Sequence, residues 1–143
     1  MKNLSFTILL LIAIAVINAS NTCIAQANNL TWSKNFNESL EHAKREHKYV
    51  LVDVYTTWCG WCKKLDKDVF EDPNFVNYVK TKFICVKADA EDPTSGQELA
   101  TKYGVSGFPT ALVFNDKGNL VGTINGYNDT SKYIEKLGTF LKK

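Results

Sequence analysis

Four short apolar runs, each bounded by polar or turn-forming residues, dominate the hydrophobic pattern of the chain. They are rich in β-branched and aromatic residues, which predicts buried β-strands. The runs span residues 49–55, 82–89, 111–114 and 120–124. The last two flank a turn-forming segment, 115–119, so they predict an antiparallel hairpin. Leu30 and Trp32 alternate with polar neighbours, which predicts a short first strand.

Between these strands, apolar residues recur at helical spacing and predict amphipathic helices. The apolar faces consist of Phe36, Leu40 and Ala43; Leu65, Val69 and Phe70; Phe75, Val76 and Val79; Leu99, Ala100 and Tyr103; and Tyr133, Ile134, Leu137 and Phe140. Asn35, with Glu38 three residues later, is typical of a helix N-cap. Asp72 followed by Pro73 indicates a second helix start, and Gly104 indicates a helix end.

The predicted order is strand, helix, strand, helix, strand, helix, strand, strand, helix. Strands separated by helices favour parallel pairing, and the final hairpin adds an antiparallel edge. The expected fold class is therefore α/β, with a central mixed sheet of four to five strands and helices on both faces. The chain has 143 residues, which suits one domain after the first segment.

The first segment, residues 1–27, is typical of a secretory signal peptide. Lys2 precedes an apolar run, 4–17, that is shorter than the roughly 20 residues of a membrane-spanning helix. Ala25-Gln26-Ala27 provides a small-x-small cleavage site, with an earlier site near Ala19 as the alternative. Cys23 could suggest a lipoprotein, but Thr22 before it is not the small residue expected there. We expect an exported domain, residues 28–143, in the periplasm or secreted.

The mild net charge of +2 is not concentrated in a basic stripe. The chain therefore lacks the electrostatic signature of a nucleic-acid-binding protein, and we expect no nucleic-acid partner.

The candidate chemistry lies in the segment Trp58-Cys59-Gly60-Trp61-Cys62-Lys63-Lys64, where the apolar strand gives way to a helix. Unpaired N–H groups and the helix dipole at the start of a helix favour a Cys59 thiolate over a thiol. Lys63 and Lys64 add positive charge nearby. Cys62, one turn further on, can close a disulfide ring with Cys59. The pattern predicts a reversible dithiol–disulfide pair.

Two other interpretations of the cysteines are a purely structural disulfide and half of a metal site. His42 and His47 lie at irregular distances from the pair and fit a charged helix surface better than a zinc site. We therefore expect no metal and no organic cofactor. Cys85 lies in an apolar strand and is expected to be a buried, inert thiol.

Asp53 interrupts an otherwise apolar strand. A buried carboxyl group is costly when charged, so burial is expected to raise the pKa of Asp53 toward neutrality. Such a group could exchange protons with Cys62 through water. The alternative is a carboxylate at the strand end that binds a backbone N–H group.

The Cys-x-x-Cys motif at a helix start, together with Gly107-Phe108-Pro109-Thr110 before a later strand, resembles the thioredoxin superfamily. The resemblance covers roughly residues 30–141 and implies the thioredoxin fold. The continuation Lys63-Lys64-x-Asp66-x-x-Val69-Phe70 is similar to exported thioredoxin-like proteins. These resemble the catalytic domains of periplasmic disulfide-reducing systems.

The resemblance implies roles for individual residues. Cys59 would be the exposed attacking thiol and Cys62 the buried resolving thiol, joined in a redox-active Cys59–Cys62 disulfide. Asp53 matches the buried acid of thioredoxins, and Lys87 matches the lysine near that acid. A merely solvated lysine is the alternative for Lys87.

The resemblance also implies a substrate-binding surface around the disulfide. Pro109 matches a cis-proline that would leave the Phe108 backbone free to pair with a substrate strand; an ordinary proline at a strand start is the alternative. Gly60-Trp61 departs from the Gly-Pro of thioredoxins proper, which leaves the redox potential open. Trp58, Trp61 and Phe108 could form an apolar docking patch, unless Trp58 packs beneath the loop.

The expected function is that of an exported thiol–disulfide oxidoreductase that reduces protein disulfides. A disulfide oxidase or isomerase of the same fold is one alternative, and a non-catalytic peptide-binding or chaperone module is another. Disulfide-containing proteins are the expected substrates, and an exported reductase needs a membrane electron donor. We expect a monomer.

Overall fold

The computed structural model describes residues 29–141, so the expected signal peptide, residues 1–27, lies outside the described residues. The elements are β1 (Trp32–Ser33), α2 (Phe36–Glu46), β2 (Tyr49–Tyr55), α3 (Gly60–Leu65), the π-helical segment η1 (Asp66–Phe70), α4 (Pro73–Val79), β3 (Phe83–Asp89), α5 (Gln97–Lys102), β4 (Thr110–Phe114), β5 (Leu120–Asn125) and α6 (Thr130–Phe140). No helix in this part of the chain is long and apolar enough to span a membrane.

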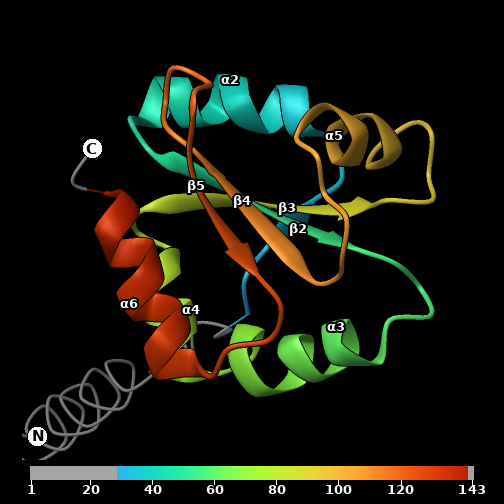
Figure 1. Ribbon diagram of the computed structural model, residues 1–143. Coiled ribbons are helices and arrows are strands. Elements are labelled where there is room, and N and C mark those ends of the chain that lie inside the picture. Colours follow the sequence, from blue (N-terminus) through green and yellow to red (C-terminus); the bar gives the residue numbers. More distant parts are fainter. Residues whose placement is uncertain (1–28, 142–143) are drawn as a thin grey trace, which may run out of the picture.

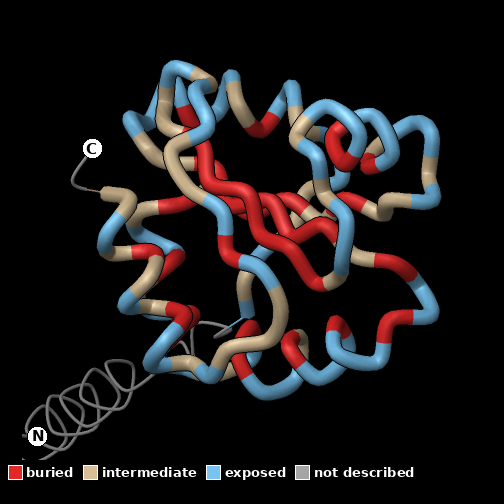
Figure 2. The backbone as a smooth tube through the Cα atoms, viewed as in Figure 1, coloured by how far each residue is buried: buried red, intermediate tan, exposed pale blue. Residues whose placement is uncertain are grey.

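The strands form one mixed sheet in the order β1-β3-β2-β4-β5. The first three of these run parallel, whereas β4 is antiparallel to β2 and β5 is antiparallel to β4. The predicted α/β class and mixed sheet are confirmed. Helices cover both faces of the sheet, which is why β2 and β4 are apolar along most of their length (Figures 1 and 2).

Successive residues of β2 point to opposite faces of the sheet. Val50, Val52 and Val54 belong to a core cluster that includes side chains of α2 and α5. Leu51 belongs to the other cluster, with side chains of α3, η1, α4 and α6. Asp53 has the same parity as Leu51, so its carboxyl group points to the face that α3 covers (Figure 1).

The predicted helix boundaries rest on local polar contacts. The Asn35 side chain accepts a hydrogen bond from the Glu38 N–H at 3.1 Å. The Asp72 carboxylate accepts one from the Asn74 N–H at 2.7 Å. Gly104 follows α5 with a φ of 64°, a conformation that glycine adopts without a Cβ clash. The two N-caps and the glycine helix end are confirmed.

Two elements differ from the expected pattern. The first strand spans only Trp32–Ser33, because it pairs with β3 over just two residues. The helix after Cys62 widens to π geometry from Asp66 onward, with the Glu71 N–H donating to the Asp66 carbonyl at 3.1 Å. Val69 and Phe70, both in this wider turn, are buried in the core.

Candidate active site

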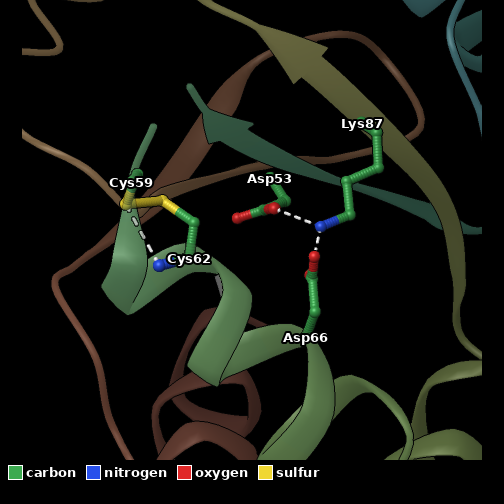
Figure 3. A network of polar contacts seen from close by, with 5 residues as sticks. All are labelled: Asp53, Cys59, Cys62, Asp66 and Lys87. Carbon is green, nitrogen blue, oxygen red and sulfur yellow. Dashed lines mark hydrogen bonds and ion pairs between the residues drawn. A yellow bond between two sulfur atoms is a disulfide. The ribbon is translucent and has the colours of Figure 1, made fainter. Parts of the chain in front are cut away.

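Cys59 is the N-cap of α3 and is joined to Cys62 by a disulfide bond (Figure 3). The Cys62 N–H donates a hydrogen bond to Cys59 Sγ at 3.0 Å. The same sulfur lies where the dipole of the helix places partial positive charge. The local sequence therefore gives Cys59 the surroundings that stabilise a thiolate when the disulfide is reduced.

The expected exposure of Cys59 is not found in the disulfide form. Cys59 is only 5% exposed, slightly more than Cys62. The disulfide holds the Cys59 sulfur against the first turn of α3, where it accepts the Cys62 N–H. Cys59 is more exposed than Cys62, as expected, but in the disulfide form both cysteines are buried.

The two lysines after the pair contribute less charge than their positions suggest. Lys64 lies 2.5 Å from the Asp68 carboxylate and 5.3 Å from the centre of the Tyr127 ring. A neighbouring carboxylate thus offsets its charge. Lys63 is exposed to solvent, which screens its charge.

Asp53 is fully buried on the α3 face of the sheet. Its Oδ2 accepts a hydrogen bond from Lys87 Nζ at 2.7 Å, because β2 and β3 pair with these two residues in register. Its Oδ1 has no hydrogen-bond partner among the described residues. Burial raises the pKa of Asp53 to about 6, although the nearby Lys87 ammonium lowers it. The expectation of a buried carboxyl group with a raised pKa agrees with this environment.

Lys87 is not a merely solvated lysine. It also donates to Asp66 at the start of η1, so one ammonium group bridges two carboxylates (Figure 3). No role was predicted for Asp66 from the sequence. Asp66 lies four residues after Cys62, which places both side chains on one face of the helix. This spacing could have indicated from the sequence that Asp66 lies near the active site.

Two tryptophans lie exposed beside the disulfide. Trp58 is 67% exposed and Trp61 is 59% exposed, so the alternative that Trp58 packs beneath the loop is wrong. The Trp58 indole N–H donates to the Glu91 carboxylate at 3.0 Å. The Trp58 ring meets Phe108 edge-on, with ring centres 6.0 Å apart.

Trp61 has a different aromatic neighbour. Its ring centre lies 5.6 Å from that of Tyr127, which follows β5. Neither Tyr127 nor Glu91 was identified from the sequence, since each contacts its tryptophan across more than 30 residues. Gly60, between the cysteines, is exposed, and a Cβ there would meet no atom within 4 Å.

The segment before β4 completes the surroundings of the pair. The peptide bond between Phe108 and Pro109 is cis, and Phe108 is half-buried. The Gly126 N–H donates to the Pro109 carbonyl at 2.8 Å, which ties the segment to the end of β5.

Among the described residues, the third cysteine and the two histidines take no part in the disulfide. Cys85 is a buried free thiol, and burial raises its pKa to about 12, so it stays protonated. His42 pairs with Glu46 at 2.8 Å, and His47 with Asp116 at 3.3 Å. Within residues 29–141, no group of three or more His, Cys, Asp or Glu side chains is placed to hold a metal ion.

The family model of the thioredoxin-like domain matches residues 36–141. Protein disulfide isomerase-like 1-1 of Arabidopsis thaliana is 31% identical over 118 residues, which cover 79% of this chain and 23% of that protein. The thiol:disulfide interchange protein DsbD of Photorhabdus laumondii is 28% identical over 96 residues, covering 66% of this chain and 17% of that protein. The chain thus spans less than a quarter of the length of these curated relatives.

A similar solved structure is that of a candidate disulphide-isomerase from Bacteroides thetaiotaomicron. It is 37% identical, with a TM-score of 0.71, and the match covers 83% of this chain and 98% of the other. The model match includes the helix that carries Cys59 and Cys62 as well as the sheet beneath it. The chain therefore belongs to the thioredoxin-like domain family, and Cys59 and Cys62 are its Cys-x-x-Cys pair.

Proposed function

We propose that this chain is an exported thiol–disulfide oxidoreductase that reduces disulfide bonds in other proteins. The observation that carries the proposal is the Cys59–Cys62 disulfide at the first turn of α3, above the buried Asp53 carboxyl group. The pair provides the redox chemistry, and the carboxyl group provides a proton acceptor. No metal or organic cofactor enters the cycle.

The cycle begins with the reduced pair. The Cys59 thiolate attacks one sulfur of a substrate disulfide, and the other substrate sulfur leaves as a thiolate. Cys62 then loses its proton and attacks Cys59 Sγ, which breaks the mixed disulfide and releases the second substrate sulfur. Two electrons have passed to the substrate, whose thiolates take up two protons, and the domain is left with the Cys59–Cys62 disulfide.

Asp53 accepts the proton of Cys62 in the second step, directly or through one water molecule. In Figure 3 its carboxyl group lies between the disulfide and the Lys87 ammonium. The Oδ1 atom, which lacks a partner among the described residues, is available for that proton. A carboxyl group with a pKa of about 6 is largely ionised at neutral pH, yet is more basic than an ordinary aspartate.

Protein substrates dock on the exposed aromatic residues around the disulfide. Trp58, Trp61 and Phe108 offer apolar area at low entropic cost, because their rings are already held by neighbouring groups. The backbone of Phe108 pairs with an extended substrate segment, and Gly60 lets that segment approach Cys59 closely.

Reduction is the direction that we favour, because Asp53 and Trp58 match thioredoxin rather than a dedicated oxidase. An oxidase or isomerase is the alternative, since several relatives are named protein disulfide isomerases. A reductase outside the cytoplasm needs electrons from a membrane donor, and the similarity to a thiol:disulfide interchange protein supports the presence of a redox partner. We propose a periplasmic or secreted monomer.

A peptide-binding or chaperone module is the second candidate, which the exposed tryptophans favour. Such a module would have no need for two linked cysteines, so catalysis is the preferred function.

Replacing Cys59 with serine is expected to abolish reduction of insulin by the reduced domain 28–143, with a loss of at least about 100-fold, because the attacking thiolate is gone. Cys62→Ser is expected to accumulate a mixed disulfide with substrate, visible by mass spectrometry. Cys85→Ser, the matched control, should retain activity. Equal reduction by wild type and Cys59→Ser would contradict the proposed function and favour the binding module.

Asp53→Asn is expected to slow resolution of the mixed disulfide by about 10- to 100-fold at pH 7 and to leave its formation nearly unchanged. In the wild type, the resolution rate should rise as the pH increases through about 6, because Asp53 becomes the basic carboxylate. This inflection should be missing in Asp53→Asn. Stopped-flow tryptophan fluorescence separates the two steps, and equal slowing of both would rule out the assigned role.

Trp61→Ala is expected to raise KM for a protein disulfide by about fivefold, since roughly 1 kcal/mol of aromatic contact is lost. KM for a small disulfide such as oxidised glutathione should not change. Lys67→Ala, an exposed residue of the following turn, is the control. A parallel change with both substrates would mean that Trp61 acts on the disulfide itself and not in docking.

Equilibration of the Cys59–Cys62 pair with glutathione is expected to give a potential of about −250 mV or lower, in the range of reducing thioredoxins. Quenched thiol alkylation at a series of glutathione ratios measures it. A potential near −120 mV, typical of a strong oxidant, would instead support the oxidase alternative.

A further inference from the structure

Lys87 is shared between two carboxylates of different surroundings. Its Nζ lies 2.7 Å from Asp53 Oδ2 and also donates to Asp66 Oδ1 (Figure 3). Asp53 comes from β2, Lys87 from β3, and Asp66 from the first residue of η1. The proposed proton transfer from Cys62 involves Asp53 and assigns no role to the contact between Lys87 and Asp66.

The Lys87 ammonium is confined by aromatic rings as well as by the carboxylates. Its Nζ lies 5.1 Å from the ring centre of Trp32, 5.2 Å from that of Tyr55 and 5.0 Å from that of Phe70. These contacts favour a cation at this position and hold the side chain in place. Lys87 would therefore remain beside Asp53 if Asp66 lost its charge.

The two carboxylates face opposite environments. Asp53 is buried, whereas the side chain of Asp66 is 45% exposed. Asp66 and Lys87 both line a cleft of about 700 Å³, together with Trp32 and Phe70, and neither cysteine lines it. Asp66 thus contacts solvent in a cleft that neither cysteine lines.

We propose that Asp66 is a positioning residue for the thiol–disulfide reaction, which offsets part of the Lys87 charge and so keeps the Asp53 carboxylate basic enough to accept the Cys62 proton. The inference rests on the proposed function and deepens it. In Figure 3 the Asp66 side chain contacts Lys87 and neither cysteine, so its charge acts through Lys87.

Burial raises the pKa of Asp53 most, and two neighbouring charges act on it in opposite directions. Lys87 stabilises the charged form of Asp53 and lowers its pKa, whereas the negative charge of Asp66 raises it. Both carboxylates contact one nitrogen, so their charges lie within a few ångströms of each other. At the effective dielectric constant of a partly buried site, an interaction over this distance shifts a pKa by about one pH unit.

Other titratable groups around Asp53 do not change charge near neutral pH. Burial raises the pKa of the Tyr55 and Tyr133 hydroxyl groups, so both stay neutral. Cys85, in the same core cluster, stays a protonated thiol. In the oxidised domain, the disulfide sulfurs carry no charge. A change in the titration of Asp53 therefore reports on Lys87 and Asp66.

The test is the titration of the Asp53 carboxyl carbon by ¹³C NMR in the oxidised domain 28–143, without substrate. Asp66→Asn is expected to lower the titration midpoint of Asp53 by about one pH unit. The Lys87 charge is then no longer offset by Asp66 and stabilises the Asp53 carboxylate more strongly. Asp66→Ser, which also lacks the charge, should act in the same direction. Asp68→Asn is the matched control, since Asp68 lies on the same helix but pairs with Lys64, and it should leave the midpoint unchanged.

A second readout is the pH profile of mixed-disulfide resolution, which should shift to lower pH in Asp66→Asn. An Asp53 midpoint in Asp66→Asn that equals or exceeds the wild-type value would overturn the inference. The carboxyl titration needs no enzymatic activity. A lowered midpoint in a domain that fails to reduce disulfides would therefore contradict the proposed function and leave the electrostatic coupling in place.

Discussion

The buried contact between Asp53 and Lys87 lies between the central strands and the helix that carries the redox-active disulfide. Moving a carboxylate and an ammonium group out of water costs several kcal/mol, so a buried ion pair is a poor source of stability. Here the pair joins the two central parallel strands at one register position. What the pair does is hold a buried carboxyl group at a fixed place beside the disulfide. The apolar residues around it provide the stability instead.

The topology brings the other parts of the site to the same edge of the sheet. β2 and β3 run parallel, so Tyr55 and Asp89 end side by side. Cys59 follows the end of β2, and Glu91 follows the end of β3. β4 runs in the opposite direction, so its beginning, just after Phe108 and Pro109, lies at that edge too. Binding sites in open α/β sheets commonly form where strand ends meet in this way.

The site has two sides with different chemistry. On the inner side, Lys87 contacts the carboxylates of Asp53 and Asp66, and aromatic rings surround its ammonium group. On the outer side, Trp58, Trp61 and Phe108 meet solvent around the sulfurs. The disulfide lies between the two sides. The proposed docking surface and the proposed proton acceptor thus consist of different residues.

Features with a local physical cause could be predicted from the sequence. The periodicity of apolar residues predicted the strands and helices, and the caps at Asn35 and Asp72 depend on neighbouring residues alone. The spacing of Cys59 and Cys62 predicted the ring, because it spans one helical turn. The position of Asp53 inside an apolar strand predicted its burial. The resemblance to the thioredoxin superfamily added Lys87.

The remaining features depend on contacts between distant elements. Asp66 meets Lys87, Glu91 meets Trp58, and Tyr127 meets Trp61 only after the strands have paired and the helices have packed. The sequence by itself determined where the two cysteines and the Asp53 carboxyl group lie in the order of strands and helices. The tertiary structure alone decided their partners and exposure, because hydrogen-bond partners and solvent access follow from packing across the whole sheet.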